Sequence, residues 1–120
     1  MANVFVVEDS QPMIELLQEL LANVGGFDVV GSCSTEAEAK LWLEENPGAW
    51  DIAVLDLVLA QGSGIGLSAH AKRTHPAGKP VVFSSYASPG IRAHCLKLGA
   101  DAVFDKNESP AFLDWLAANR

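Results

Sequence analysis

The sequence predicts an α/β fold in which five parallel strands alternate with five helices. Two observations predict it: short apolar runs recur along the whole chain, and each is followed by a longer segment whose apolar residues recur at helical spacing. Such regular alternation is typical of a parallel sheet covered by helices on both faces and joined by right-handed crossovers. The chain has 120 residues, which is the size of a single domain of this kind, so residues 1–120 are expected to form one domain.

The first strand and helix are predicted from an apolar run and the helix signals after it. Residues 4–7 are an uninterrupted apolar run, as in a strand buried on both faces. Ser10 can cap the following helix, Pro12 suits its first turn, and Gly25 and Gly26 end it. The apolar residues of this helix recur at helical spacing: Ile14, Leu17, Leu21 and Val24.

The second unit is predicted in the same way. Residues 27–33 have the composition of a strand. Thr35 and Glu38 have the spacing of a capping box, which predicts a helix through Glu45. Pro47, with the glycine after it, ends that helix and closes the unit.

The remaining three units complete the pattern. Apolar strands are predicted at residues 52–55, 81–83 and 102–104. Serine–proline pairs at 88–89 and 109–110 begin the last two helices. The third helix follows a glycine-rich stretch that we interpret as an irregular loop: Gly62, Gly64 and Gly66.

Composition and charge exclude several classes of protein. Hydrophobic residues make up 49% of the chain and charged residues 19%, a balance typical of a packed domain. The formal net charge of −7 opposes binding to phosphate backbones, so no nucleic-acid partner is expected. No apolar run is long enough to span a bilayer and no leader segment is recognisable, so we expect a cytoplasmic protein without membrane contact. Cys33 and Cys95 lack metal-ligand spacing and are expected to be reduced core thiols.

Polar residues gather where the predicted strands end. In open α/β sheets, ligands bind beyond the carboxyl ends of the strands, at the point where the strand order reverses. The candidates there are Glu8 and Asp9 after the first strand, Asp56 after the third, Ser84 and Ser85 after the fourth, and Lys106 after the fifth.

Three carboxylates in one place require a compensating cation. One pair of like charges at 4 Å costs roughly 4 kcal/mol at an effective dielectric of 20. Mg²⁺ prefers oxygen ligands and bridges carboxylates to phosphate oxygens, so Glu8, Asp9 and Asp56 are predicted as its ligands. Asp56 can then act as a phosphoryl-accepting nucleophile, with Lys106 and a serine hydroxyl contacting the phosphoryl oxygens.

Four motifs in this order resemble the response regulator receiver family over essentially the whole chain. They are E-D at 8–9, D-L-V-L-A-Q-G-S-G at 56–64, S-S-Y at 84–86 and G-A-D-A-V-F-D-K at 99–106. The resemblance implies a flavodoxin-like (βα)5 doubly wound fold, with a five-stranded parallel sheet in order 2-1-3-4-5. It also implies phosphorylation of Asp56 by a histidine kinase or histidine phosphotransfer protein. The chain would act as a phosphoacceptor and not as an enzyme, although it could assist its own phosphorylation and dephosphorylation.

The resemblance also implies roles for the residues around Asp56. Counting back from Lys106 puts Ser84 at the family's switch hydroxyl, with Ser85 as the alternative. The switch would signal to a separate downstream protein of unknown identity. Val103 takes the family's aromatic switch position, which leaves Tyr86 as a candidate for that role. Asn107 replaces the family's proline after the lysine, so a cis peptide bond there is not favoured.

Other functions remain open alongside the switch. One is a receiver-like docking module that works without phosphorylation. Another is an aspartate-nucleophile phosphatase, but such enzymes place a second aspartate two residues after the nucleophile, where this chain has Val58. A flavin-binding domain is a third, although Glu8 and Asp9 would repel its phosphate. No role is assigned to the three histidines, and the three tryptophans are expected to pack in the core.

Overall fold

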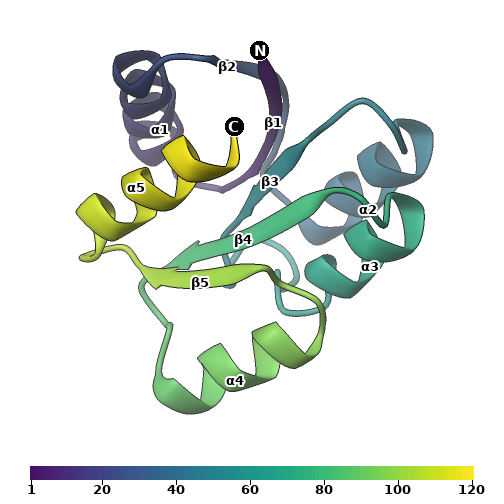
Figure 1. Cartoon of the computed structure of the whole chain (residues 1–120). Coiled ribbons are helices and arrows are strands. Elements are labelled where there is room, and N and C mark those ends of the chain that lie inside the picture. The colour runs from purple at the N-terminus through teal and green to yellow at the C-terminus, as the bar shows by residue number, and fades with distance from the viewer.

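The chain forms one parallel sheet with helices on both faces. A computed structural model describes all residues 1–120 (Figure 1). The strands are β1 (Ala2–Val7), β2 (Phe27–Cys33), β3 (Ile52–Leu55), β4 (Lys79–Ser84) and β5 (Ala102–Asp105). The helices are α1 (Gln11–Val24), α2 (Glu36–Glu45), α3 (Leu67–Thr74), α4 (Pro89–Lys97) and α5 (Ser109–Asn119).

The strand order is β2-β1-β3-β4-β5, which confirms the predicted flavodoxin-like topology. The chain moves outward from β1 to β2, then returns to the other side of β1 to begin β3. The reversal of strand order therefore falls between β1 and β3. In the ladder between these two strands, Val7 pairs with Leu55, so both strands end at the same level.

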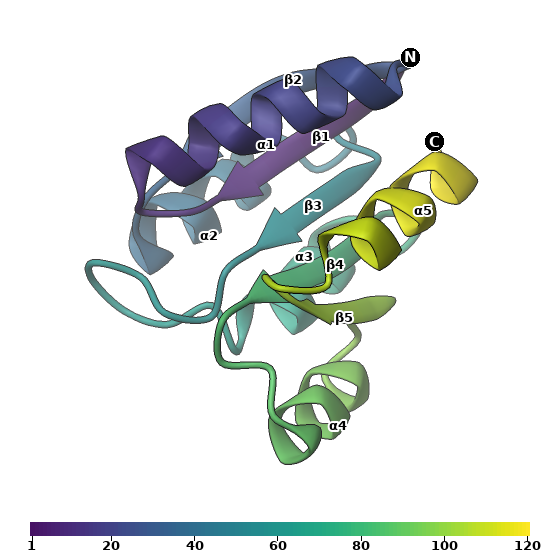
Figure 2. The same ribbon diagram turned by 90° about the vertical axis from the view of Figure 1, so that its left-hand side faces the viewer.

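The helices divide between the two faces of the sheet. Helices α1 and α5 cover one face, and α2 and α3 cover the other (Figures 1 and 2). Alternate residues of each strand point to opposite faces, so β1 sends Val4 and Val6 to the α1/α5 core and Phe5 and Val7 to the α2/α3 core. A third cluster packs Cys95 of α4 against β4 and β5.

Aromatic residues contribute to both cores. Phe83 stacks on Phe112 of α5 with ring centroids 4.1 Å apart. On the other face, Phe5 stacks on Trp42 of α2 at 4.0 Å. Trp50 is fully buried in the α2/α3 core, as predicted for a packing residue.

The predicted helix signals are present at several termini. Ser10 caps α1 by accepting a hydrogen bond from the Met13 N–H at 3.4 Å, and Gly25, with φ 81°, ends that helix. Thr35 caps α2 by accepting from the Glu38 N–H at 3.2 Å. Strands β1, β4 and β5 extend beyond their predicted ranges. The apolar pattern failed to show these extra residues because the sheet ladder continues through Asn3, Lys79 and Asp105, which are polar.

Both cysteines are free thiols, in agreement with the sequence. Cys95 is buried and Cys33 is half-buried. Burial raises the pKa of each thiol above its usual value. None of the five helices has the length and apolar character that a transmembrane helix needs.

Candidate functional site

Backbone hydrogen bonds that continue the sheet beyond its strands position the two buried carboxylates. The Glu8 N–H donates to the Cys33 carbonyl at 3.0 Å, and the Asp56 N–H donates to the Val7 carbonyl at 3.0 Å. The ends of β1 and β3 lie at the same edge of the sheet (Figure 2). Glu8 and Asp56 therefore stand side by side at the point where the strand order reverses.

Glu8, Asp9 and Asp56 form an acidic cluster at this edge. One carboxylate oxygen from each lies within 4.8 Å of the other two. Glu8 is 2% exposed and Asp56 is 6% exposed, whereas Asp9 faces solvent. The cluster is thus enclosed on the protein side and open on the side of Asp9.

Lys106 reaches into the same cluster from the end of β5. Its Nζ lies 2.6 Å from Glu8 Oε1 and 3.1 Å from Asp56 Oδ2. The Lys106 backbone N–H donates to the Ser84 carbonyl at 3.1 Å, which holds this residue beside the end of β4. Side chains separated by up to 98 positions in the sequence thus meet at one place.

Backbone N–H groups hold the other oxygens of the two buried carboxylates. Glu8 Oε2 accepts from the Asp9 N–H at 2.9 Å and, more weakly, from the Ser10 N–H at 3.4 Å. Asp56 Oδ1 accepts from the Leu57 N–H at 2.8 Å. Buried carboxylates require such partners, so each carboxylate has a defined orientation.

Burial and neighbouring charges shift the pKa values within the cluster. The pKa of Glu8 is raised to about 7, mainly by burial; Lys106 acts to lower it and Asp56 to raise it. Burial alone would lower the pKa of Lys106, but the hydrogen bonds and charges of Glu8 and Asp56 raise it above its usual value. The cluster has more negative charge than one lysine can balance.

Ser84 and Ser85 lie at the end of β4 in different environments. Ser84 is fully buried, and its hydroxyl oxygen accepts from the Tyr86 N–H at 3.3 Å. Ser85 and Tyr86 are exposed. No hydrogen bond joins either serine hydroxyl to the acidic cluster, so neither serine takes part in the ion-pair network around Lys106.

A family model for the response regulator receiver domain matches residues 4–115, which include this whole cluster. The chain belongs to the response regulator receiver family. Receiver domains are signalling modules of two-component systems, and they bind Mg²⁺ at an acidic pocket.

The receiver is similar in sequence to part of a transcriptional activator. It is 32% identical over 108 residues to the DNA-binding transcriptional activator DevR/DosR of Mycobacterium tuberculosis, covering 89% of this chain and 48% of the relative. The receiver thus spans about half of that relative's length.

Solved structures share the fold. The signal receiver domain of the response regulator NarL from M. tuberculosis has a TM-score of 0.79 and 25% identity, with 99% of this chain and 98% of that chain covered. A response regulator from Burkholderia pseudomallei, solved with a phosphorylated aspartic acid, a calcium ion and citrate, has a TM-score of 0.78 and 24% identity. That match covers 100% of this chain and 67% of the other.

The receiver's departures from the family pattern lie next to the cluster. Val103, at the aromatic switch position, is buried and packs with Cys95 beneath α4. The Lys106–Asn107 peptide bond is trans, as are all others in the chain. Val58, two residues after Asp56, is half exposed and carries no group that transfers protons.

Sequence reasoning missed how tightly the loop after β3 packs around Asp56. A Cβ on Gly64 would stand 1.8 Å from the Asp56 carbonyl oxygen, so no other residue fits there without moving the backbone. The glycine-rich composition was the available signal. Composition indicated an irregular loop but could not show which backbone atom the glycine approaches.

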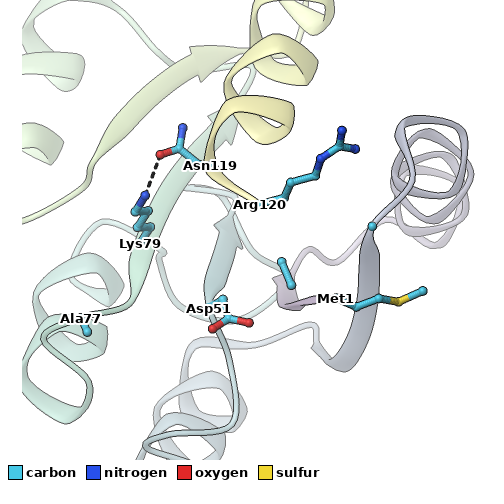
Figure 3. Close-up of a pocket in the computed structure, with 8 residues that line it drawn as sticks. Met1, Asp51, Ala77, Lys79, Asn119 and Arg120 are labelled. Carbon is cyan, nitrogen blue, oxygen red and sulfur yellow. Dashed lines mark hydrogen bonds between the residues drawn. The ribbon is translucent and has the colours of Figure 1, made fainter.

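The largest cavity of the receiver lies at the opposite end of the sheet. It measures about 590 Å³ and is bordered by residues near the amino ends of the strands, among them Asp51 and Lys79, and by Asn119 and Arg120 of the C-terminal segment (Figure 3). Lys79 Nζ donates to Asn119 Oδ1 at 2.8 Å across its edge. None of the predicted site residues borders this cavity.

Proposed function

We propose that residues 1–120 form a receiver domain that accepts a phosphoryl group on Asp56 from a histidine kinase or a histidine phosphotransfer protein. One observation supports this most strongly. Three carboxylates from the ends of β1 and β3 and the ammonium group of Lys106 converge at the switch point of the sheet. The aspartate of such a cluster can act as a nucleophile because the Leu57 N–H and Lys106 orient its carboxylate before a donor arrives.

The acidic cluster has the composition of a magnesium site. Its donors are all carboxylate oxygens, which Mg²⁺ prefers, and its net charge with Lys106 included favours a divalent cation. Glu8, Asp9 and Asp56 would hold the ion, with Asp9 on the solvent side. When bound, Mg²⁺ would neutralise charge on the oxygens of the transferring phosphoryl group.

The transfer itself is a displacement at phosphorus. A carboxylate oxygen of Asp56 attacks the phosphorus atom and an O–P bond forms. The P–N bond to the donor histidine breaks, and the imidazole leaves with its electron pair and takes up a proton. Lys106 Nζ, 3.1 Å from Asp56 Oδ2, is positioned to pair with a phosphoryl oxygen as it arrives.

The signal is then a change in the segment after β4. The phosphorylated side chain carries about 1.5 to 2 negative charges, where the free Asp56 carboxylate carries one. The Ser84 hydroxyl, whose oxygen accepts from the Tyr86 N–H, would donate to a phosphoryl oxygen, and the Lys106 ammonium group would move toward the same charge. Because Lys106 is bonded through its backbone to Ser84, both movements would alter the connection to α4 and the surface read by a separate partner protein.

Two alternatives belong to different classes. A docking module that works without phosphorylation would retain the same fold but would not need the acidic cluster. An aspartate-nucleophile phosphatase would need an acid/base group near Asp56, where Val58 offers none. The observed cluster supports phosphoryl acceptance over both.

The proposal is tested by labelling the protein with acetyl phosphate in the presence of Mg²⁺. Intact mass spectrometry with peptide mapping should find one phosphoryl group on Asp56. Asp56→Asn should abolish the labelling, whereas Asp114→Asn, on the exposed side of α5, should leave it unchanged. Labelling that persists in Asp56→Asn would disprove the assignment, and continuous release of phosphate would favour the phosphatase.

A further inference from the structure

The loop between β3 and α3, residues 56–66, is held against the first turn of α2. We propose that Glu36, the first residue of α2, is a positioning residue that holds this loop in the conformation that orients Asp56 for phosphorylation. This inference rests on the proposed function of Asp56.

Glu36 binds the loop through both its side chain and its backbone. Its Oε1 accepts from the Ser63 N–H at 2.9 Å, and its own N–H donates to the Gln61 carbonyl at 3.1 Å. Its Oε2 pairs with Lys40 one helical turn later at 2.9 Å. Glu36 supplies the only side chain from outside the loop that hydrogen-bonds to residues 57–66.

The contact continues from Ser63 to Asp56 through hydrogen bonds. The Ser63 hydroxyl donates to the Leu57 carbonyl at 3.3 Å, and the Gly64 N–H donates to the same oxygen at 2.9 Å. The Leu57 N–H donates to Asp56 Oδ1 at 2.8 Å. Because the Leu57 carbonyl and N–H are both held, its orientation determines where Asp56 Oδ1 lies.

Gly62 makes the approach of the loop to Glu36 possible. It has φ +86°, a conformation that favours glycine, and a Cβ there would stand 2.5 Å from the Glu36 Cβ. The loop is thus built to meet this side chain closely. The Ser63 N–H and then Lys40 lower the pKa of Glu36, so the carboxylate remains a charged acceptor near neutral pH.

The test measures the rate of Asp56 labelling by acetyl phosphate at saturating Mg²⁺ in four variants. Glu36→Ala should slow labelling about tenfold, because losing a hydrogen bond to a charged group changes a rate or equilibrium by roughly a factor of ten. Glu36→Gln keeps an acceptor for the Ser63 N–H and should retain most of the rate. Lys40→Ala removes only the neighbouring ion pair and should change little.

Glu38→Ala is the matched control for a purely structural role. Glu38 carries the same charge in the same helical turn and bonds to Ser34 and Thr35, but it makes no hydrogen bond to the loop. It should lower the melting temperature without slowing the labelling. Equal slowing in Glu36→Ala and Glu38→Ala would overturn the proposal, because helix stability would then explain both.

Amide hydrogen exchange supplies a readout independent of phosphorylation. Glu36→Ala should speed exchange at the Gly64 N–H more than at the Ala39 N–H, which belongs to the first turn of α2. If the wild-type protein labels at Asp56 and Glu36→Ala labels at the same rate, the role of Glu36 is refuted and the proposed function is retained. Failure of the unaltered protein to label at all would refute both.

Discussion

Lys106 is the residue on which the charge balance of the acidic cluster depends. Its ammonium group contacts Glu8 at 2.6 Å and Asp56 at 3.1 Å, and these two carboxylates are almost fully buried. Removing one partner from a buried ion pair leaves an uncompensated charge. The resulting loss of stability is larger than the stability that the intact pair contributes. Without Lys106, the two carboxylates would face each other with only backbone N–H groups to compensate.

Lys106→Ala should therefore destabilise the protein in the absence of divalent cations. The expected loss in the free energy of unfolding is about 3 kcal/mol, as for other buried pairs that lose one member. Urea unfolding in the presence of a chelator measures it, and Mg²⁺ should restore part of the loss. Lys97→Ala, at an exposed lysine of α4, is the control. Equal stability of the two variants would show that Lys106 does not balance the buried carboxylates.

At the scale of elements, Arg92 connects α4 to its surroundings on three sides. Its Nε donates to the Ala87 carbonyl before α4 at 3.0 Å, and its Nη1 donates to the Val103 carbonyl of β5 at 2.8 Å. Its Nη2 pairs with Glu108, which also accepts from the Asp105 N–H at 2.8 Å. The segment after β4, the end of β5 and the start of α5 are thus linked through one guanidinium group.

Arg92→Ala should lower the free energy of unfolding by about 2 kcal/mol near neutral pH, because two backbone carbonyls lose their donor. The pKa of Glu108 is held below its usual 4.5 by Arg92 and then by the Asp105 N–H. A lowered folded-state pKa stabilises above pH 4.5, and the effect is lost as the pH falls through the folded-state value.

The difference between wild type and Arg92→Ala should thus narrow in acid, which urea unfolding at a series of pH values measures. Arg73→Ala serves as a control, since the only side-chain hydrogen bond of Arg73 is to the His70 ring nitrogen. A difference that stays constant from neutral to acidic pH would show that the Glu108 pair contributes nothing to stability.

At the scale of the whole molecule, the parallel register determines the site. Val7 pairs with Leu55, Leu55 with Val82, and Ser84 with Asp105, so the residues after β1, β3 and β5 emerge at one edge. The two hydrophobic cores on either face hold the sheet in this register. Ligand binding at the edge is therefore linked to the stability of the entire fold.

Mg²⁺ should raise the melting temperature of the protein by binding its native state. At a concentration one hundred times its dissociation constant, a native-state ligand adds about 2.7 kcal/mol to the free energy of unfolding. Differential scanning calorimetry with and without Mg²⁺ measures the gain, which should disappear in Asp9→Ala.

Asp28→Ala, at an exposed aspartate of β2 remote from the cluster, should retain the full gain. The assignment of Asp9 as a ligand would fail if Mg²⁺ raised the melting temperature of Asp9→Ala as much as that of the wild type.

The sequence alone determined the order of strands and helices and most of their boundaries. The signals for these elements are local: apolar runs and the capping residues Ser10, Thr35 and Ser88. Each of these capping side chains accepts a hydrogen bond from a backbone N–H three residues later, as predicted. The candidate residues Glu8, Asp9, Asp56 and Lys106 could also be named, because their positions at strand ends follow from that order. The resemblance to receivers supplied the strand order, which the sheet confirms.

Only the tertiary structure decided how these residues contact one another. The pairing of Lys106 with both Glu8 and Asp56, the contact of Glu36 with Ser63, and the three bonds of Arg92 join segments far apart in the chain. Periodicity and capping describe interactions over a few residues, whereas these contacts depend on strand register and on the packing of helices against the sheet. A sequence pattern can place a carboxylate at a strand end, but the neighbouring strands determine which groups it faces.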